Sequence, residues 1–273
     1  MNPSLEKADD PSKLRRIAID PVSRVEGHGK VTLLLDDQNR VHQVRLHIVE
    51  FRGFERFIEG RPYWEVPVMV QRLCGICPVS HHLAAAKALD LVVGARRLTP
   101  TAEKVRRLMH YGQILQSHAL HFYHLASPDL LFGFGSEPAK RNIVGVLGAY
   151  PDLARRGVLL RRFGQEVIRI TAGKRVHGTG AIPGGVNKAV TLAEREELLA
   201  VLPDILEWAR AGVALVAELH AQNPGLYASF GTVRSNLLSL VGEGGKLDLY
   251  DGTLRARDLS MNSASRMAIE VVV

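Results

Sequence analysis

The only two cysteines in the chain form a C-x-x-C pair, Cys74 and Cys77, within residues 72–82. Two thiolates at this spacing can chelate one soft metal ion. Pro78 suits the first turn of a helix, and the alanine-rich residues 78–93 contain no helix breaker. Cys77 is therefore expected at a helix amino terminus, where unpaired N–H groups and the helix dipole favour a thiolate.

A C-x-x-C pair also has other interpretations: a structural disulfide, a thioredoxin-like redox pair, or half of a zinc site. No strand–helix–strand pattern surrounds this pair, which disfavours the redox interpretation. A closed zinc site needs four nitrogen or sulfur ligands, so it would have to recruit His81 and His82. His81 follows Cys77 by one helical turn, close enough to ligate a metal or to hydrogen-bond a sulfur. The spacing alone leaves these alternatives open.

Several further motifs, in a fixed order, narrow the interpretation. They are Arg24-Val25-Glu26-Gly27-His28, Phe51-Arg52-Gly53-Phe54-Glu55, Arg72-x-Cys74-Gly75-x-Cys77 with His81, Ser117-His118-Ala119-Leu120-His121-Phe122-Tyr123-His124-Leu125, Gly173-Lys174-Arg175-Val176-His177, and Pro183-Gly184-Gly185-Val186. Together they resemble the large subunit of [NiFe]-hydrogenases over roughly residues 15–255. The residues around the first motifs are similar to the cytoplasmic NAD-reducing type.

The resemblance implies a role for five side chains. In that family four cysteine thiolates hold nickel, and two of them bridge to an iron that carries CO and cyanide ligands. Cys74 corresponds to a terminal nickel ligand and Cys77 to a bridging one. Glu26 corresponds to the proton-transfer glutamate, Glu55 to a carboxylate associated with a structural magnesium, and His81 to a hydrogen-bond donor to the sulfurs.

These implied roles are chemically coherent. Heterolytic cleavage of H2 gives a hydride and a proton, so a soft thiolate-bound metal must accept the first and a nearby base the second. A carboxylate in a partly dehydrated site can perform that proton transfer, which is the task implied for Glu26. Without the resemblance, Glu26 would be interpreted as a surface strand residue and Glu55 as an exposed residue in a charged stretch.

Partners and further cofactors are also implied. Large subunits of this family pair with an iron–sulfur small subunit, and the NAD-reducing type adds flavin-containing diaphorase subunits. The chain has no G-x-G-x-x-G motif, so NAD, FMN and iron–sulfur clusters are expected only in those partners. The predicted function is oxidation of H2, with electrons passed to the iron–sulfur partner.

The carboxyl end of the chain departs from the family pattern. The family takes its other two cysteine ligands from a second C-x-x-C motif, and this sequence of 273 residues contains none. A centre lacking half of its thiolates would be open and labile, which puts activity of the chain as written in doubt. A frameshift or premature stop is the hypothesis for the atypical tail, residues 259–273. The rival hypotheses are a non-catalytic remnant or scaffold of the same fold, and a zinc-binding structural module.

Charge and hydropathy exclude other classes of function. The basic residues behind the formal charge of +7 are spread along the chain, with short pairs such as Arg155-Arg156 and Arg161-Arg162, a pattern typical of a solvated face. No RNA-binding or zinc-finger motif accompanies it, so no nucleic-acid partner is expected. The sequence has no run of 18 uncharged apolar residues and no signal-peptide core, which predicts a cytoplasmic protein without membrane insertion.

The periodicity of the sequence predicts a helix-rich α+β fold, with a bundle of long helices and a small amino-terminal antiparallel sheet. Alternating residues at 17–36 and 41–49 predict a hairpin that presents Glu26 and Glu55 near its ends. We expect three parts: a flexible segment 1–14, a partial large-subunit domain 15–258, and the tail.

Helix signals dominate after residue 61. Helices are predicted at 67–73, 78–93, 99–126, 138–147, 152–171 and 191–220. Pro128 is expected to stop the helix that begins at residue 99. Thr191 and Glu194 form a capping box at the start of the last helix. A second hairpin is predicted at 245–258, with Asp251-Gly252 as its turn.

Overall fold

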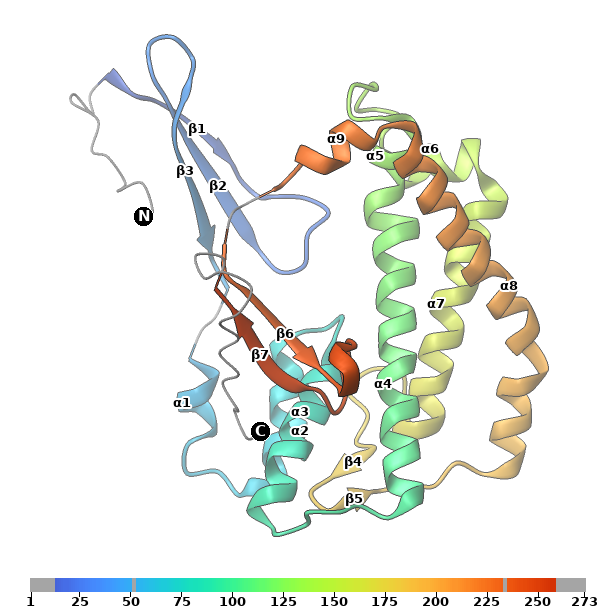
Figure 1. Cartoon of the computed structure of the whole chain (residues 1–273). Coiled ribbons are helices and arrows are strands. Elements are labelled where there is room, and N and C mark those ends of the chain that lie inside the picture. The colour runs from blue at the N-terminus through green and yellow to red at the C-terminus, as the bar shows by residue number, and fades with distance from the viewer. Residues whose placement is uncertain (1–12, 51–52, 233–234, 259–273) are drawn as a thin grey trace. The chain divides into compact units, whose positions relative to one another are not determined.

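The computed structural model describes residues 13–50, 53–232 and 235–258. The chain divides into two compact units, Met1–Gly60 and Arg61–Val273. The helix-rich α+β class with a small amino-terminal sheet is confirmed (Figure 1). Most of the predicted segment 1–14 and all of the predicted tail 259–273 lie outside the described residues. Within the described residues no helix is long and apolar enough to cross a membrane.

The first unit contains a three-stranded antiparallel sheet. Its strands are β1 (Arg15–Ile19), β2 (Gly29–Leu35) and β3 (Val41–Ile48), in the spatial order β1-β2-β3. Ile17 pairs with Leu33, which pairs with Val44, so the alternating apolar residues of all three strands share one face.

The predicted strand 17–36 was wrong in its length, because it is two strands separated by the loop 20–28. Pro21 has no N–H for a sheet ladder, and Arg24 and Gly27 have positive φ values of 54° and 75°. Beyond the sheet, the short helix α1 (Phe54–Ile58) begins after Gly53, whose φ is 97°.

The second unit is built mainly from helices. In chain order its elements are η2 (Tyr63–Glu65), α2 (Val66–Met69), η3 (Val70–Leu73), α3 (Pro78–Val92), α4 (Pro100–Leu120), the π-helical turn η4 (His121–Ala126), α5 (Ser127–Phe132), α6 (Ile143–Ala149), α7 (Pro151–Ala172), β4 (Ala181–Ile182), β5 (Gly185–Val186), α8 (Leu192–Gln222), α9 (Pro224–Ser229), β6 (Leu237–Val241), η5 (Glu243–Gly245) and β7 (Thr253–Arg257).

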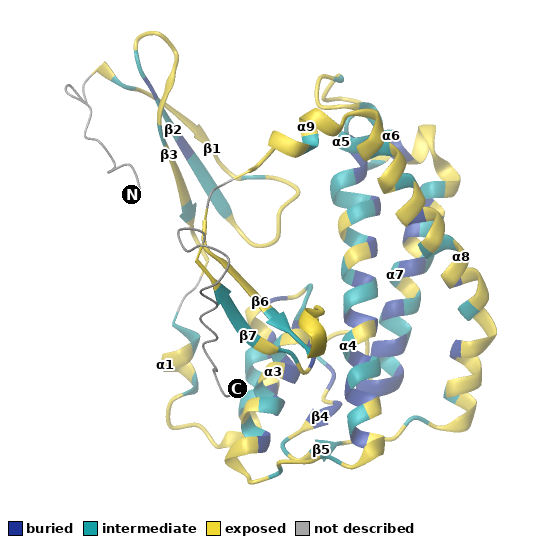
Figure 2. Cartoon of the chain, viewed as in Figure 1, coloured by how far each residue is buried: buried dark blue, intermediate teal, exposed yellow. Residues whose placement is uncertain are grey.

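The core of this unit lies where α4 and α7 run side by side, and their facing sides are buried (Figure 2). Glycines allow the two backbones to approach closely. A Cβ added to Gly164 would lie 2.6 Å from the backbone oxygen of Gly112. Met109 of α4 and Ile168 of α7 are almost fully buried beside Leu83 of α3, which joins this core.

Some predicted boundaries hold and others do not. The helix predicted at 138–147 is α6, which begins only at Ile143, after the N-cap Asn142. The capping box at Thr191 is present and opens α8, as predicted. Pro128 does not end the helical run, because it occupies the first turn of α5, where a missing N–H costs no hydrogen bond. The second hairpin is wrong in its first strand and its turn: β6 lies before residue 245 and pairs with β7 across the whole connection 242–252, with Val241 opposite Thr253, so Asp251-Gly252 is not a two-residue turn between the strands.

Candidate metal centre

The cysteine pair lies in the turn between η3 and α3. Cys74 directly follows η3 with an extended backbone, and Cys77 is the N-cap of α3, with Pro78 in the first turn as predicted. Neither thiol forms a disulfide; Cys74 is buried and Cys77 half-buried. The backbone N–H of Cys77 donates to Sγ of Cys74 at 3.3 Å. Such a donor offsets negative charge on a sulfur that ligates a metal.

His81 contacts the second sulfur of the pair. Its Nε2 lies 3.6 Å from Sγ of Cys77, one helical turn along α3. The structure therefore brings Cys74, Cys77 and His81 together, as the sequence predicts, and leaves the role of the imidazole as a prediction. The His81 side chain is half-buried, so one part of the ring faces the Cys77 sulfur and another part is accessible to solvent.

His82, by contrast, is used by the fold. It is 1% exposed; its Nδ1 donates to the Pro67 carbonyl at 2.7 Å, and its Nε2 accepts from the Ala181 N–H at 3.0 Å. Burial lowers the pKa of His82, which keeps the ring neutral. His82 therefore cannot supply the fourth ligand of a zinc site without losing both bonds. The sequence carried a signal for this, because adjacent helical residues point about 100° apart and cannot both face one sulfur.

Three buried glutamines, none of them expected from the sequence, hold the rest of the cysteine turn. Gln71 donates from Nε2 to the Gly178 carbonyl at 3.0 Å, which ties η3 to the glycine-rich segment 173–188. Gln113 and Gln116 of α4 both donate to the carbonyl of Ile76, between the two cysteines, at 3.2 and 3.0 Å. Their spacing of three residues, which places two amides on one helix face, was the available signal.

The glycine-rich segment meets the cysteine turn at a second point. Nη1 of Arg72 lies 2.9 Å from Nδ1 of His177, whose backbone has a positive φ of 53°. Burial, together with the Arg72 charge, lowers the pKa of His177, so its Nδ1 can accept from the guanidinium. A Cβ on Gly178 would lie 2.6 Å from the Ala172 carbonyl oxygen, so the close approach of this segment requires glycine.

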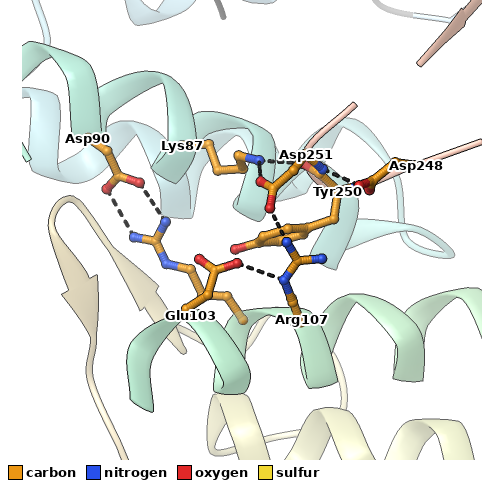
Figure 3. A network of polar contacts seen from close by, with 8 residues as sticks. Lys87, Asp90, Glu103, Arg107, Asp248, Tyr250 and Asp251 are labelled. Atoms are coloured by element: carbon orange, nitrogen blue, oxygen red, sulfur yellow. Dashed lines mark hydrogen bonds and ion pairs between the residues drawn. The ribbon is translucent and has the colours of Figure 1, made fainter. Parts of the chain in front are cut away.

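A polar network fixes α3 to α4 and to the turn before β7 (Figure 3). Lys87 of α3 donates to the Tyr250 carbonyl and to Asp251 at 2.8 Å, and Arg107 of α4 pairs with Asp251 and with Glu103. Both cations lie over the Tyr250 ring, at 4.2 and 4.6 Å from its centroid. Burial of the Tyr250 hydroxyl raises its pKa to about 12. The network fixes the middle of α3, whose first turn follows Cys77.

Glu26 and Glu55 lie in the other unit, and both are exposed there. Glu26 lies in the loop 20–28, between β1 and β2. Glu50 closes this loop by accepting from the His28 N–H at 2.8 Å and by pairing with the His28 ring. The hydrogen bond from the His28 ring to the Glu50 carboxylate lowers the pKa of Glu50. Glu55 is in the first turn of α1 rather than at an end of the sheet.

The donors present fit part of a soft-metal site. Two thiols and one imidazole are ligands that nickel, iron and zinc accept. Over residues 13–50, 53–232 and 235–258, no group of three or more His, Cys, Asp or Glu side chains is arranged to hold a metal ion. The cysteine turn thus offers two adjacent thiolate positions with a hydrogen-bonding imidazole, rather than a closed coordination sphere.

Comparison with known proteins gives a consistent result. Residues 16–51 match a family described as HoxL-like, and residues 52–131 match the nickel-dependent hydrogenase family. The NAD-reducing hydrogenase HoxS subunit beta of Cupriavidus necator is 47% identical over 255 residues, which are 89% of this chain and 52% of that protein. A subunit of the F420-non-reducing hydrogenase vhu of Methanocaldococcus jannaschii is 46% identical over 88% of this chain and 57% of that protein.

Solved structures agree with these relatives. The crystal structure of an NAD+-reducing [NiFe]-hydrogenase in the H2-reduced state matches with a TM-score of 0.86 and 61% identity, over 89% of this chain and 54% of that chain. A [NiFeSe]-hydrogenase of Dm. baculatum matches with a TM-score of 0.69 and 26% identity, over 84% and 50% of the two chains. The chain thus spans about half the length of the relatives it matches.

Proposed function

The chain belongs to the family of [NiFe]-hydrogenase large subunits, and from that premise we propose that it supplies the amino-terminal half of a nickel–iron centre that oxidises H2. The observation that carries the proposal is the pair of adjacent cysteine thiols, not joined in a disulfide, in the turn before α3, with an N–H donor on one sulfur and an imidazole beside the other. The remaining thiolates would come from the part of the relatives that this chain does not span.

In this proposal the chain's own residues hold the metals and orient one of the sulfurs. Cys74 and Cys77 would hold the nickel–iron centre, Cys74 in the role of a terminal nickel ligand and Cys77 in that of a bridging ligand, with CO and cyanide as the further ligands of the iron. The centre, when bound, supplies a soft Lewis acid that polarises H2 for heterolytic cleavage. His81 holds the Cys77 sulfur by a hydrogen bond, which fixes the direction of its remaining lone pairs.

Two carboxylates complete the proposed chemistry. Glu26 accepts the proton released from H2 and passes it outward, and Glu55 contributes to a structural magnesium site. Their motifs support these roles: Arg24-Val25-Glu26-Gly27-His28 lies within the matched residues 16–51, and Glu55 within residues 52–131. The hydrogen bond from the His28 N–H to Glu50 closes the loop 20–28 and so limits the positions that Glu26 can take.

The proposal extends to partners. Electrons pass to an iron–sulfur small subunit, and flavin-containing diaphorase subunits with FMN and NAD complete the path in the cytoplasm. The surface of α8 supports further protein contacts, because Leu192 and Val213 are 79% and 72% exposed, with Leu199 and Leu206 at the intervening seven-residue steps. Surface stripes of this kind are usually covered in an assembly.

Metal analysis of the chain, co-expressed with the remaining hydrogenase subunits, tests the proposal. Nickel together with iron, and H2-dependent NAD+ reduction, are the expected results. Zinc alone would indicate the structural module, and no metal would indicate a non-catalytic scaffold. The Cys74→Ser and Cys77→Ser double variant should lose nickel and H2 oxidation. Normal H2 uptake by that variant would refute the assignment of these thiols.

A further inference from the structure

The backbone carbonyl of Ile76 receives two side-chain amides at once. Gln113 and Gln116 of α4 donate to it from their Nε2 atoms at 3.2 and 3.0 Å, and both side chains are buried, at 3% and 2% exposure. A carbonyl oxygen has two lone pairs, so both bonds form together. This carbonyl lies in the segment between the two cysteines.

The bonded carbonyl belongs to the peptide group that joins Ile76 to Cys77. The other end of the same group is the Cys77 N–H, which donates to Sγ of Cys74 at 3.3 Å. A trans peptide is planar, and its C=O and N–H point in opposite directions. When the two glutamines fix the oxygen, they therefore also aim the N–H at the sulfur.

The turn is loosely packed on the side of Gly75. A Cβ added to the preceding Gly75 would meet nothing within 4 Å, so the turn has free space on that side. The Cys74 N–H bonds to the Gln71 carbonyl at a long 3.4 Å. The two buried amides, which come from a separate helix, thus restrain rotation of the Ile76–Cys77 peptide.

Stability alone does not explain Gln113. Its Oε1 is buried and has no hydrogen-bond partner within the described part of the chain. Turning the amide over would place this oxygen against the Ile76 carbonyl, so the orientation is fixed. An unsatisfied buried acceptor destabilises the folded state. An apolar side chain would avoid that cost, and a residue that breaks a local rule in this way commonly serves a site.

We propose that Gln113 and Gln116 are positioning residues, which fix the Ile76–Cys77 peptide so that its N–H stays on the Cys74 sulfur and the two thiols keep one separation and direction. The inference deepens the proposed function and rests on it for the identity of the metal. Its geometric part, the restraint of the thiols, stands on this chain alone. Both glutamines act through the backbone carbonyl rather than through a sulfur.

The test uses the full chain, reduced and free of oxygen, with Co(II) as the metal probe. Gln113→Met and Gln116→Met keep the length of each side chain and remove its donor. Removal of such supporting hydrogen bonds weakens metal binding by roughly 10–100-fold. We expect that loss for each variant, with a shifted thiolate-to-cobalt absorption band. Ser127→Ala is the matched control, because it also removes one buried hydrogen bond to a carbonyl, at 2.7 Å, in another helix.

A second readout does not depend on metal. Iodoacetamide alkylates Cys74, and peptide mass analysis follows the rate. This rate should rise about tenfold in either glutamine variant and stay unchanged in the control. A local opening made easier by about 1.4 kcal/mol gives that factor. Gln116→Asn, which withdraws the amide by one methylene, provides a further variant if the methionine substitutions unfold the chain.

The outcomes separate the two proposals. If the unmodified chain gives no thiolate–cobalt band but the variants expose Cys74, the two thiols do not bind the metal without the remaining ligands, and the positioning inference holds. If alkylation rates and cobalt spectra of both glutamine variants equal those of the unmodified chain, the positioning inference is overturned. Equal changes in Ser127→Ala would overturn it as well, because they would show a general loss of stability.

Discussion

Arg106 of α4 provides a quantitative test of what holds α3, α4 and the β4–β5 hairpin together. Its side chain is fully buried and forms a bidentate ion pair with Asp90 of α3, at 2.6 and 3.0 Å. The same guanidinium donates to the carbonyls of Ile182 at 2.6 Å and Gly185 at 3.1 Å. Asp90 in turn accepts from the Gly184 N–H at 2.7 Å. One side chain thus joins α3, α4 and the β4–β5 hairpin.

The Arg106→Met substitution should be severely destabilising. It keeps the volume of the aliphatic stem and leaves the Asp90 carboxylate buried without its cationic partner, a change that costs about 3–5 kcal/mol. Two carbonyls also lose their donor, at about 1 kcal/mol each. The sum, roughly 5–7 kcal/mol, is a large share of the 5–15 kcal/mol by which domains are typically stable.

The double variant Arg106→Met with Asp90→Leu separates the charge from the packing. Removing both charges abolishes the unpaired carboxylate, so the double variant should be more stable than Arg106→Met by about 2–3 kcal/mol. The Gly184 N–H still loses its acceptor in the double variant, so full recovery is not expected. Urea unfolding followed by circular dichroism measures both. A loss below about 1 kcal/mol for Arg106→Met, or a double variant less stable than the single, would refute this reasoning.

Three further predictions concern single positions. Burial lowers the pKa of His82, so below about pH 6.5 the unfolded chain binds a proton that the folded chain does not. As the pH decreases below that value, the free energy of unfolding should therefore decrease by up to about 1.4 kcal/mol per pH unit. His82→Gln should flatten that dependence of the urea midpoint between pH 5 and 8, and an unchanged slope would contradict it. Gly164→Ala should lower the free energy of unfolding by about 1–3 kcal/mol, because its Cβ would meet the Gly112 carbonyl. The control Gly148→Ala, which has open space around it in α6, should be neutral or stabilising. Equal effects of the two substitutions in thermal melts would count against the close packing of α4 on α7. Tyr250→Phe removes a buried hydroxyl without a partner among the described residues and should change stability by less than about 1 kcal/mol in the same melts, so a larger loss would show that the hydroxyl is bonded.

The local elements were predictable because their signals lie close together in the sequence. Pro78 after Cys77 fixed the start of α3, and Thr191 with Glu194 fixed the start of α8. The errors arose where a local signal had two outcomes. A proline such as Pro128 ends a helix in its interior but begins one in its first turn, and the sequence around it does not distinguish the two.

The chemistry of the site divides in the same way. The sequence by itself determined the two thiols, the imidazole one turn later, and the family to which their motifs point, since these depend on residues within short segments. Only the tertiary structure decided that His82 belongs to the core and that Gln113 and Gln116, about 40 positions away along the chain, bond to the carbonyl of Ile76. The His82 bonds depend on how α3 packs against α2 and β4, and the glutamine bonds on how α4 packs against the turn before α3. Local spacing indicates which side chains share a helix face, but packing decides which distant residue each of them meets.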